Sequence, residues 1–396
     1  MKDDRDMWRS LYSRAVAEED LIAGLHRIEL IEEFSPYRQH QVPYFTRVER
    51  SLNQLPPRFR DAALAVFANV VYLPSQLLDA TFGYLWHAVI ESARHAGRDV
   101  PNSFDDIHVF EVDPSGLAPR FAQLNALSGR LNADRNSRIS DVQSALTALT
   151  NVLDLPDSDP GKEARHDLRL IASKKHWIVL TDKALSGQSL VGDIERFVQL
   201  RRLLNAWTPQ CDPHIYVCAQ VMTADAQYYL GKDTSLLPEW HEISLLHALL
   251  FDERAKVNSA ECEIFATPRM HDEVRELCEW FATNLLIADR SLHTIIARSK
   301  DGMAYGYRGC GLLLADAFNT PTNSLPILWY STVDSEADIV DLPDECAEYH
   351  GPFFRTHSRR GLETPRWASA RWSDLHEQNE IARIVRALGP WEGELK

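Results

Sequence analysis

Apolar residues recur at helical spacing along the first hundred residues of the chain. Segments 21–34, LIAGLHRIELIEEF, and 59–97, which begins FRDAALAVF, carry them every three or four positions, as one face of an amphipathic helix requires. Pro74 interrupts the second segment, and Gly97 stands where a helix C-cap is expected. We therefore expect residues 1–100 to form a helical region that packs on a neighbouring domain.

Beyond residue 105 the pattern changes to that of buried strands. Short apolar runs typical of strands lie at 107–112 (IHVFEV), 177–180 (WIVL), 214–222 (HIYVCAQVM) and 261–267 (ECEIFAT). The segment 193–207, DIERFVQLRRLLNAW, predicts a helix between two of these strands. Two apolar strands joined by one helix indicate a βαβ unit of a parallel sheet.

The remaining elements complete the predicted domain plan. A helix is expected at 272–286, and two apolar runs flank a Pro- and Asn-rich turn within 311–332. The order of elements predicts an α/β fold with three parts. These are the helical N-terminal region at 1–100, a parallel-sheet, Rossmann-like core at 101–335, and a C-terminal extension at 336–396.

Composition and charge narrow the class of protein. The chain has 396 residues, 45% of them hydrophobic, and a net charge of -15, which argues against broad, unspecific binding to nucleic acid or anionic lipid. Its six cysteines show no C-x-x-C spacing, so a zinc ribbon or a thioredoxin-like site is not expected, and we assign no metal ligands. The charged start, MKDDRDMWRS, lacks the apolar core of a signal peptide, and no apolar run is long enough to span a bilayer. We expect a cytoplasmic protein without membrane contact.

The candidate chemistry follows the strand at 177–180. Loops at the carboxyl ends of parallel strands carry ligand sites, and residues 181–189, TDKALSGQS, lie at that edge. Gly187 lets the backbone turn tightly, Ser186 and Ser189 offer hydroxyl groups, and the amides of residues 186–189 open a helix that favours an anion. Asp182 is placed to accept hydrogen bonds from sugar hydroxyls. The pattern suits a ribose 5-phosphate, and the alternative is an ordinary strand–loop–helix turn with serine as the N-cap.

The same segment, WIVLTDKALSGQS, resembles the phosphoribosyl-pyrophosphate motif of type I phosphoribosyltransferases. The resemblance places Asp182 on the second acid of the motif, Gly187 on its glycine, and Ser186 and Ser189 on its hydroxyl positions. Thr181 occupies the position of the first acid. The substrate contacts that the resemblance implies in this motif are Thr181, Asp182, Lys183, Ala184, Leu185, Ser186, Gly187, Gln188 and Ser189. Of these, Asp182 is the expected catalytic residue.

A wider resemblance covers roughly residues 60–356. The order of parts is similar to the phosphoribosyltransferase-like domain of bacterial conflict (anti-phage) systems, some of them retron-linked, and NTPTNSLPILW at 319–329 is its most specific piece. In that family a pyrophosphate loop follows an earlier strand, which points here to Ser115, Gly116 and Arg120. The alternative for this loop is a plain Pro-Ser-Gly turn. A basic lid is implied at 130–138, where a solvated charged loop is the competing interpretation. For the turn at 319–323 we favour a structural role over a place beside the site.

The resemblance also implies a function. It implies an effector of anti-phage defence that binds phosphoribosyl pyrophosphate or a related nucleotide and transfers or cleaves at ribose carbon 1, with Mg²⁺ as cofactor. Expected partners are a defence-system protein or RNA, such as a reverse transcriptase and its RNA, and a second copy of the chain. Because Thr181 replaces an acid, the alternative is a catalytically silent nucleotide-binding or scaffold subunit.

Overall fold

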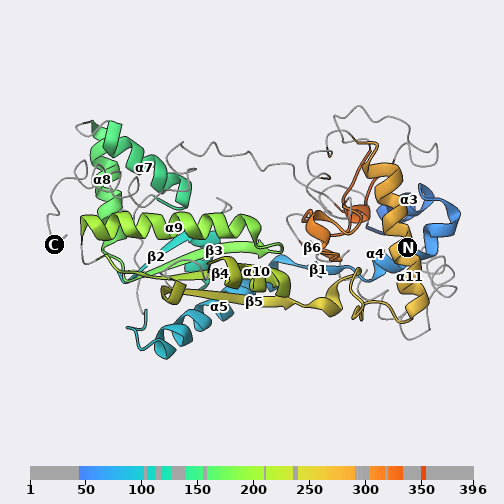
Figure 1. Ribbon diagram of the computed structural model, residues 1–396, viewed down its shortest axis with the longest axis horizontal. Helices are drawn as coiled ribbons and strands as arrows, with labels where there is room; N and C mark the ends of the chain where they lie inside the picture. Colours follow the sequence, from blue (N-terminus) through green and yellow to red (C-terminus); the bar gives the residue numbers. More distant parts are fainter. Residues whose placement is uncertain are drawn as a thin grey trace. The chain divides into compact units, whose positions relative to one another are not determined.

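The computed structural model describes residues 44–101, 105–112, 117–125, 139–154, 158–208, 211–234, 240–289, 292, 296, 303–316, 320–332 and 349–353. These residues divide into two compact units (Figure 1). Unit 1 holds the described residues up to Leu78 and from Phe251 onward, and unit 2 holds those from Asp79 to Leu250. The domain boundaries expected after residues 100 and 335 stay predictions. The expected helix at 21–34 and most of the C-terminal extension lie outside the described residues.

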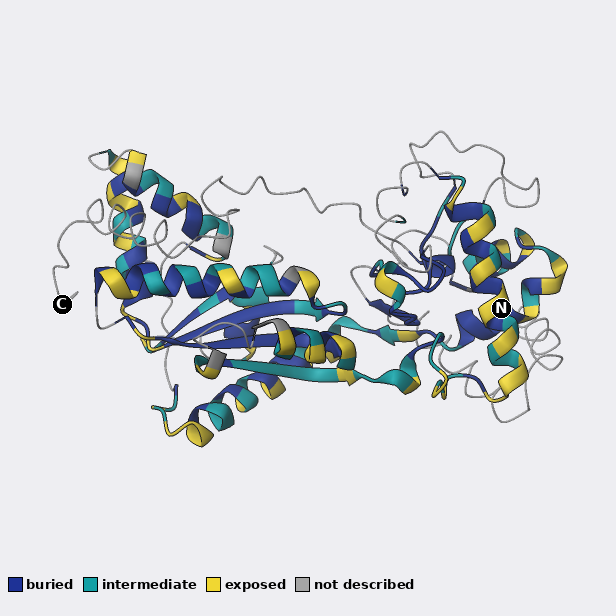
Figure 2. Cartoon of the chain, viewed as in Figure 1, coloured by how far each residue is buried: buried dark blue, intermediate teal, exposed yellow. Residues whose placement is uncertain are grey.

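Unit 2 is built on a four-stranded sheet with the strand order β2-β3-β4-β5. The strands are β2 (Ile107–Glu111), β3 (His176–Ala184), β4 (His214–Thr223) and β5 (Ile243–Phe251). Strands β2, β3 and β4 run parallel, with Ile107 opposite His176 and His176 opposite His214. All ten residues of β4 are buried, as expected for a central strand covered on both faces (Figure 2).

Helices cover both faces of this sheet (Figure 1). They are α5 (Ser75–His95), α6 (Leu117–Leu124), α7 (Val142–Asp154), α8 (Asp159–Ala172), α9 (Gln188–Trp207) and α10 (Ala224–Thr234). Because strand side chains alternate, Trp177 and Val179 of β3 pack in the core with α7–α10, whereas Ile178 and Leu180 pack in the core with α5 and α6. The predicted parallel-sheet α/β fold, with a helix between β3 and β4, is confirmed.

The predicted helix end at Gly97 is also confirmed. Gly97 has a φ of 64°, in the left-handed region that favours glycine. The Arg98 amide donates to Ala93 O and the Gly97 amide donates to Arg94 O, each at 3.0 Å. These two bonds are those of a Schellman cap, which satisfies the last carbonyls of α5.

Two strand predictions need correction. The segment 261–267 is not a strand: it forms turns, in which the Cys262 amide donates to Ser259 O and the Glu263 amide donates to Arg254 O. The strand that follows α10 is instead β5, whose apolar sequence ISLLHALLF was not assigned to the sheet. Strand β3 also continues to Ala184, four residues beyond the expected end at Leu180.

Unit 1 is mainly helical, with two short strands. Its longer elements are α3 (Tyr44–Asn53), α4 (Arg60–Ala68) and α11 (Pro268–Phe281), which continues into a π-helical turn at Ala282–Leu286. The strands β1 (Val71–Leu73) and β6 (Leu314–Asp316) pair in parallel, with Val71 opposite Leu314. The α11 sequence matches the helix expected at 272–286, and the short strand β1 was not expected from the sequence.

The turn at 320–325 joins the backbone of unit 1. Ser324 Oγ donates to Leu314 O at 2.6 Å, and the Leu325 amide donates to Leu312 O at 2.9 Å. Asn323 Nδ2 donates to Tyr307 O at 3.1 Å. These bonds hold the turn against β6, in agreement with the favoured structural role, while Asn319 lies outside the described residues.

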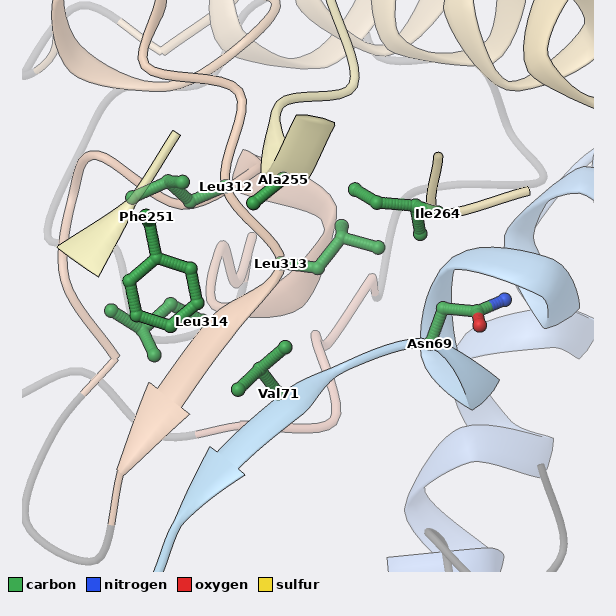
Figure 3. Close-up of a pocket in the computed structure, with 8 residues that line it drawn as sticks. All are labelled: Asn69, Val71, Phe251, Ala255, Ile264, Leu312, Leu313 and Leu314. Carbon is green, nitrogen blue, oxygen red and sulfur yellow. The ribbon is translucent and has the colours of Figure 1, made fainter. Parts of the chain in front are cut away.

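A small cavity in unit 1 has a volume of about 30 Å³ (Figure 3). It lies beside β1 and β6, and its walls are mostly apolar side chains, among them Val71, Phe251, Ile264 and Leu313. Ligand pockets for small molecules measure roughly 300–1,000 Å³. This cavity has room for about a water molecule and is not a nucleotide site.

Candidate functional site

The carboxyl end of β3 passes into α9 through a short turn. Strand β3 ends at Ala184, the turn comprises residues 185–187, and α9 begins at Gln188. Thr181, Asp182 and Lys183 therefore belong to the last part of the strand rather than to a loop. Their backbone is fixed by pairing with β4, in which Thr181 lies opposite Ala219 and Lys183 opposite Val221.

Gly187 is required by the turn and by the packing of the next helix. Its φ of 72° is left-handed, and a Cβ at this position would lie 3.1 Å from Ala226 O and 3.3 Å from Leu230 Cγ of α10. The sequence interpretation assigned this close approach to a ligand, whereas the structure shows a close approach to α10. Contact of the Gly187 backbone with a ligand stays a prediction.

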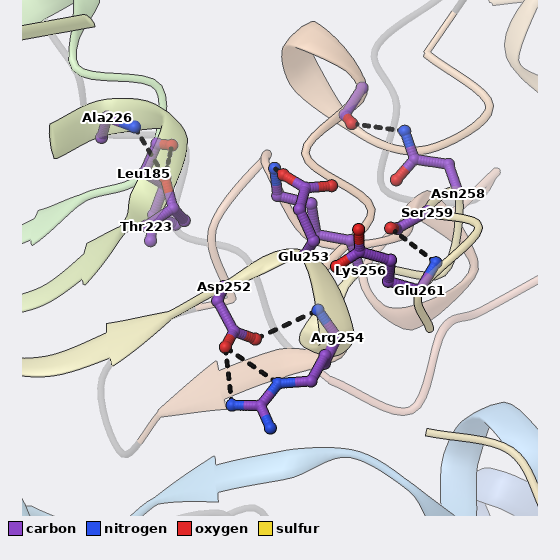
Figure 4. Close-up of polar contacts among 11 residues, drawn as sticks. Leu185, Thr223, Ala226, Asp252, Glu253, Arg254, Lys256, Asn258, Ser259 and Glu261 are labelled. Atoms are coloured by element: carbon purple, nitrogen blue, oxygen red, sulfur yellow. Dashed lines mark hydrogen bonds and ion pairs between the residues drawn. The ribbon is translucent and has the colours of Figure 1, made fainter. Parts of the chain in front are cut away.

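Thr223, at the end of β4, fixes the turn from the other side (Figure 4). Its Oγ1 donates to Leu185 O at 2.7 Å and accepts from the Ala226 amide at 3.0 Å. The second bond is that of an N-cap, because Thr223 immediately precedes α10 and Ala226 is the third residue of that helix. Thr223 is fully buried. One hydroxyl thus joins the β3–α9 turn to the start of α10.

The N-cap residue of α9 provides no side-chain hydrogen bond, unlike those of α8 and α11. Ser158 Oγ accepts from the Gly161 amide at the start of α8, and Thr267 Oγ1 accepts from the Met270 amide at the start of α11. The N-cap residue of α9 is Gly187, which has no side chain with which to cap the helix. The amides of a first helical turn have no carbonyl partner within the helix and carry the positive end of its dipole. The start of α9 is therefore suited to an anion.

Asp182 is held by the residue that follows it. Asp182 Oδ1 accepts from the Lys183 amide at 2.6 Å, and Asp182 Oδ2 lies 2.9 Å from Lys183 Nζ. The Asp182 side chain is 44% exposed, and that of Lys183 is 11% exposed. The carboxylate thus faces solvent while its charge is balanced from the protein side.

The expected contact residues differ in accessibility. Asp182 and Ser186 are half-buried and Gln188 is exposed, so their side chains reach the surface. Thr181, Ala184 and Leu185 are buried and face the protein. The side chain of Ser189 is outside what the structure describes.

Residues 48–337 match the model of the PRTase-CE family, in which PRTase abbreviates phosphoribosyltransferase. The match covers well over half of the 396 residues and includes β3, the turn and α9. The chain belongs to the PRTase-CE family. No curated protein and no solved structure shows significant similarity to it.

The family assignment confirms the phosphoribosyltransferase-like domain that the motif at 177–189 indicated. The parallel α/β sheet of this PRTase-CE chain fits that domain type. Within the described part of the chain, no helix is both long and apolar enough to cross a bilayer.

The expected pyrophosphate loop is described only in part. Ser115 and Gly116 lie outside the described residues, as does the expected basic lid at 130–138. Arg120, on α6, forms a two-pronged ion pair with Asp79 of α5, and its pKa is raised by hydrogen bonding to Asp79. Glu111, at the end of β2, accepts from the Ala118 amide at 2.8 Å, so a carboxylate binds the first turn of α6.

Sequence reasoning missed two residues of β4, Gln220 and Thr223. Gln220 of β4 is buried and donates through Nε2 to Thr81 Oγ1 of α5 at 2.9 Å. A glutamine within an apolar strand is a usable signal for such a bond. Thr223 stands between an apolar strand and a helical run, and a threonine at that position is a recognised N-cap signal.

Proposed function

We propose that this PRTase-CE chain binds a phosphorylated ribose, phosphoribosyl pyrophosphate or a related nucleotide, at the carboxyl end of β3. The observation that carries the proposal is the junction between β3 and α9. There a helix begins directly after a left-handed glycine, which has no side chain to cap it, and a half-exposed carboxylate lies at the end of the preceding strand. Membership of the family supports the same ligand class.

The proposed roles follow from charge. The 5-phosphate lies against the first turn of α9, where the helix dipole and the hydroxyl of Ser186 favour an anion. Asp182 accepts hydrogen bonds from the ribose hydroxyls. Its carboxylate has remaining lone pairs for them, because each oxygen accepts more than one hydrogen bond.

The proposed reaction is substitution at ribose carbon 1. A base nitrogen or a water oxygen bonds to carbon 1 while the bond from carbon 1 to the pyrophosphate oxygen breaks. Pyrophosphate leaves with the electron pair, and the attacking group releases its proton to solvent. The chain contributes by holding the ribose in place and by stabilising charge, rather than by a covalent step of its own.

The described residues offer Mg²⁺ no set of protein ligands. They contain no group of three or more His, Cys, Asp or Glu side chains placed to hold a metal ion. At the proposed site Asp182 is a single carboxylate, already paired with Lys183. We therefore assign no step of the reaction to the metal that the resemblance implied.

We further propose a cytoplasmic role in anti-phage defence. A reverse transcriptase with its RNA, another defence-system protein and a second copy of the chain are the proposed partners. The support for this context is the resemblance carried by NTPTNSLPILW at 319–329. Isolation of the chain from infected cells under mild conditions, followed by identification of the bound protein and RNA, tests it.

A catalytically silent nucleotide-binding or scaffold subunit is the second candidate. The observation in its favour is that the end of β3 offers a single acid, because Thr181 is neutral and buried, and this acid is already paired with Lys183. Release of pyrophosphate from phosphoribosyl pyrophosphate with a panel of bases distinguishes the two candidates. Binding without release would favour the silent subunit.

Asp182→Asn tests the site itself. Losing a charged hydrogen-bond partner costs about 1.5–3 kcal/mol, so we expect the ligand Kd in calorimetry to rise roughly tenfold or more. Asp252→Asn is the matched control. Asp252 is 42% exposed, and it likewise binds a nearby amide and the head group of a basic neighbour, Arg254 (Figure 4). Equal affinities of the two variants and the wild type, with unchanged melting of each, would place the ligand elsewhere.

A further inference from the structure

Strand β5 forms one edge of the sheet of unit 2. The order β2-β3-β4-β5 gives it a single neighbour, β4. Among the described residues, no segment other than β4 forms a backbone hydrogen bond with Ile243–Phe251. The opposite edge of the sheet differs, because there the Glu111 amide of β2 donates to Ser140 O at 2.7 Å. Within the described part of the chain, β5 is therefore the edge that remains open to another strand.

The sequence of β5 does not protect this edge. Natural edge strands avoid pairing with other chains by being short or by carrying charged residues or proline. Strand β5 has nine residues, ISLLHALLF, and contains neither a charged residue nor a proline. Residues 244–249 are half-buried and Leu250 is 44% exposed (Figure 2). A long, apolar and partly exposed edge of this kind is suited to the addition of a strand.

The order of residues in β5 favours a second copy of the same strand. His247 is the middle residue of the nine. If two copies pair antiparallel about a two-fold axis at His247, Leu245 lies opposite Leu249 of the partner subunit. Leu246 then lies opposite Ala248 of the partner subunit. Directly opposite residues point to the same face, so apolar side chains meet on both faces of the joined sheet.

The same pairing extends the two cores of unit 2. Leu245 packs against the core with α7–α10, whereas Leu246 and Ala248 pack against the core with α5 and α6. All three side chains are only partly buried in the single chain. A second copy would cover them further, and it would join the two four-stranded sheets into one. Such a two-fold contact is closed, because each copy uses the same surface.

We propose that two copies of this chain associate through β5, with the two strands antiparallel about a two-fold axis at His247. This inference rests on the part of the proposed function that names a second copy as a partner, and it gives that partner a surface. It does not depend on the ribose-phosphate site.

A charge swap at His247 tests the pairing in the full chain. Sedimentation equilibrium over a range of concentrations measures the dimer Kd. His247→Lys and His247→Glu each place two like charges opposite one another at the axis, so we expect the Kd of each variant to rise by roughly tenfold or more. An equal mixture of the two variants pairs a lysine with a glutamate and should regain much of the lost association. A variant that had failed to fold would not be rescued in this way.

Two further measurements locate the contact. His166→Lys is the matched control, because His166 is exposed on α8 and lies outside β5. We expect this control to dimerise like the wild type. Hydrogen exchange of the wild type should show protection of the amides of residues 243–251 at high concentration, and loss of that protection for about half of them on dilution, since alternate amides of an edge strand face the open side.

The outcomes separate the surface from the partner. If the wild type dimerises and both His247 variants dimerise equally well, or if their mixture regains no association, the β5 surface is overturned while a second copy stays a partner. If the wild type is monomeric at every concentration, both are overturned. Full protection of the β5 amides in the monomer would show that another segment of the chain occupies this edge, and it would overturn the inference as well.

Discussion

Thr223→Val is the sharpest test of how the turn before α9 is held. Valine keeps the shape and the strand preference of threonine but removes the hydroxyl group that bonds to both Leu185 O and the Ala226 amide. Thr223 is fully buried, so water cannot replace either bond without local opening. The substitution isolates one oxygen atom as the cause of any effect.

The expected magnitude follows from those two bonds. A buried polar group that loses its partner costs about 1–3 kcal/mol, and loss of an N-cap costs about 0.5–2 kcal/mol. With partial relaxation we expect the free energy of unfolding of unit 2 to fall by about 2–4 kcal/mol. Urea denaturation followed by circular dichroism measures this, provided that the slope of the transition is unchanged.

Two controls decide the interpretation. Thr223→Ser keeps both hydrogen bonds and should lose less than half as much stability as valine. Thr147→Val removes a hydroxyl that donates to Gln143 O on the exposed face of α7, and surface changes of this kind stay within about 0.5 kcal/mol. If Thr223→Val were no more destabilising than Thr147→Val, the hydroxyl would not hold the turn.

Two other perturbations test the same unit. Gly187→Ala should destabilise unit 2 by at least about 1–2 kcal/mol, because alanine is strained at this left-handed φ and its Cβ would meet the Ala226 backbone. Gly192→Ala, at a position in α9 with open space around it, should instead stabilise the unit by about 0.5–1 kcal/mol. Thermal melts that rank the two variants the other way would contradict the packing of Gly187 against α10. Burial lowers the pKa of His108 to about 4 from its ordinary value of 6.5. Because the unfolded chain takes up this proton first, the stability due to neutral His108 is complete above about pH 6.5 and is lost as the pH falls toward about 4. His108→Gln should flatten that part of the decline in urea midpoints between about pH 7 and about pH 5, and an unchanged decline would show that His108 does not contribute.

The sequence predicts the parts of unit 2 whose signals are local. The apolar run at 177–180, a turn with glycine and a long helix identify the core of β3 and α9, because period and turn chemistry lie within one stretch of chain. Gly97 is predicted for the same reason, since a helix C-cap depends on its own few residues. The family motif at 177–189 belongs to this class of local signals.

Other features depend on partners far along the chain. The segment ISLLHALLF has no clear alternation, and only its place beside β4 makes it strand β5. Strand β1 exists because Val71–Leu73 pairs with Leu314–Asp316, and neither short segment predicts the other. The packing of Gly187 against α10 also depends on a distant segment. The sequence predicts that a glycine lies in a turn, but it does not predict which helix packs against that glycine.

The missing first acid of the motif has a structural reason. Alternation along β3 places Thr181 on the same face as Trp177 and Val179, toward the core with α7–α10, and its partner Ala219 belongs to that core. An aspartate there would bury a charge, which is far more costly than a hydroxyl that lies 3.5 Å from Lys183 O. Packing thus restricts the end of β3 to one acid on the accessible side. Because that acid is single, one lysine is enough to neutralise it.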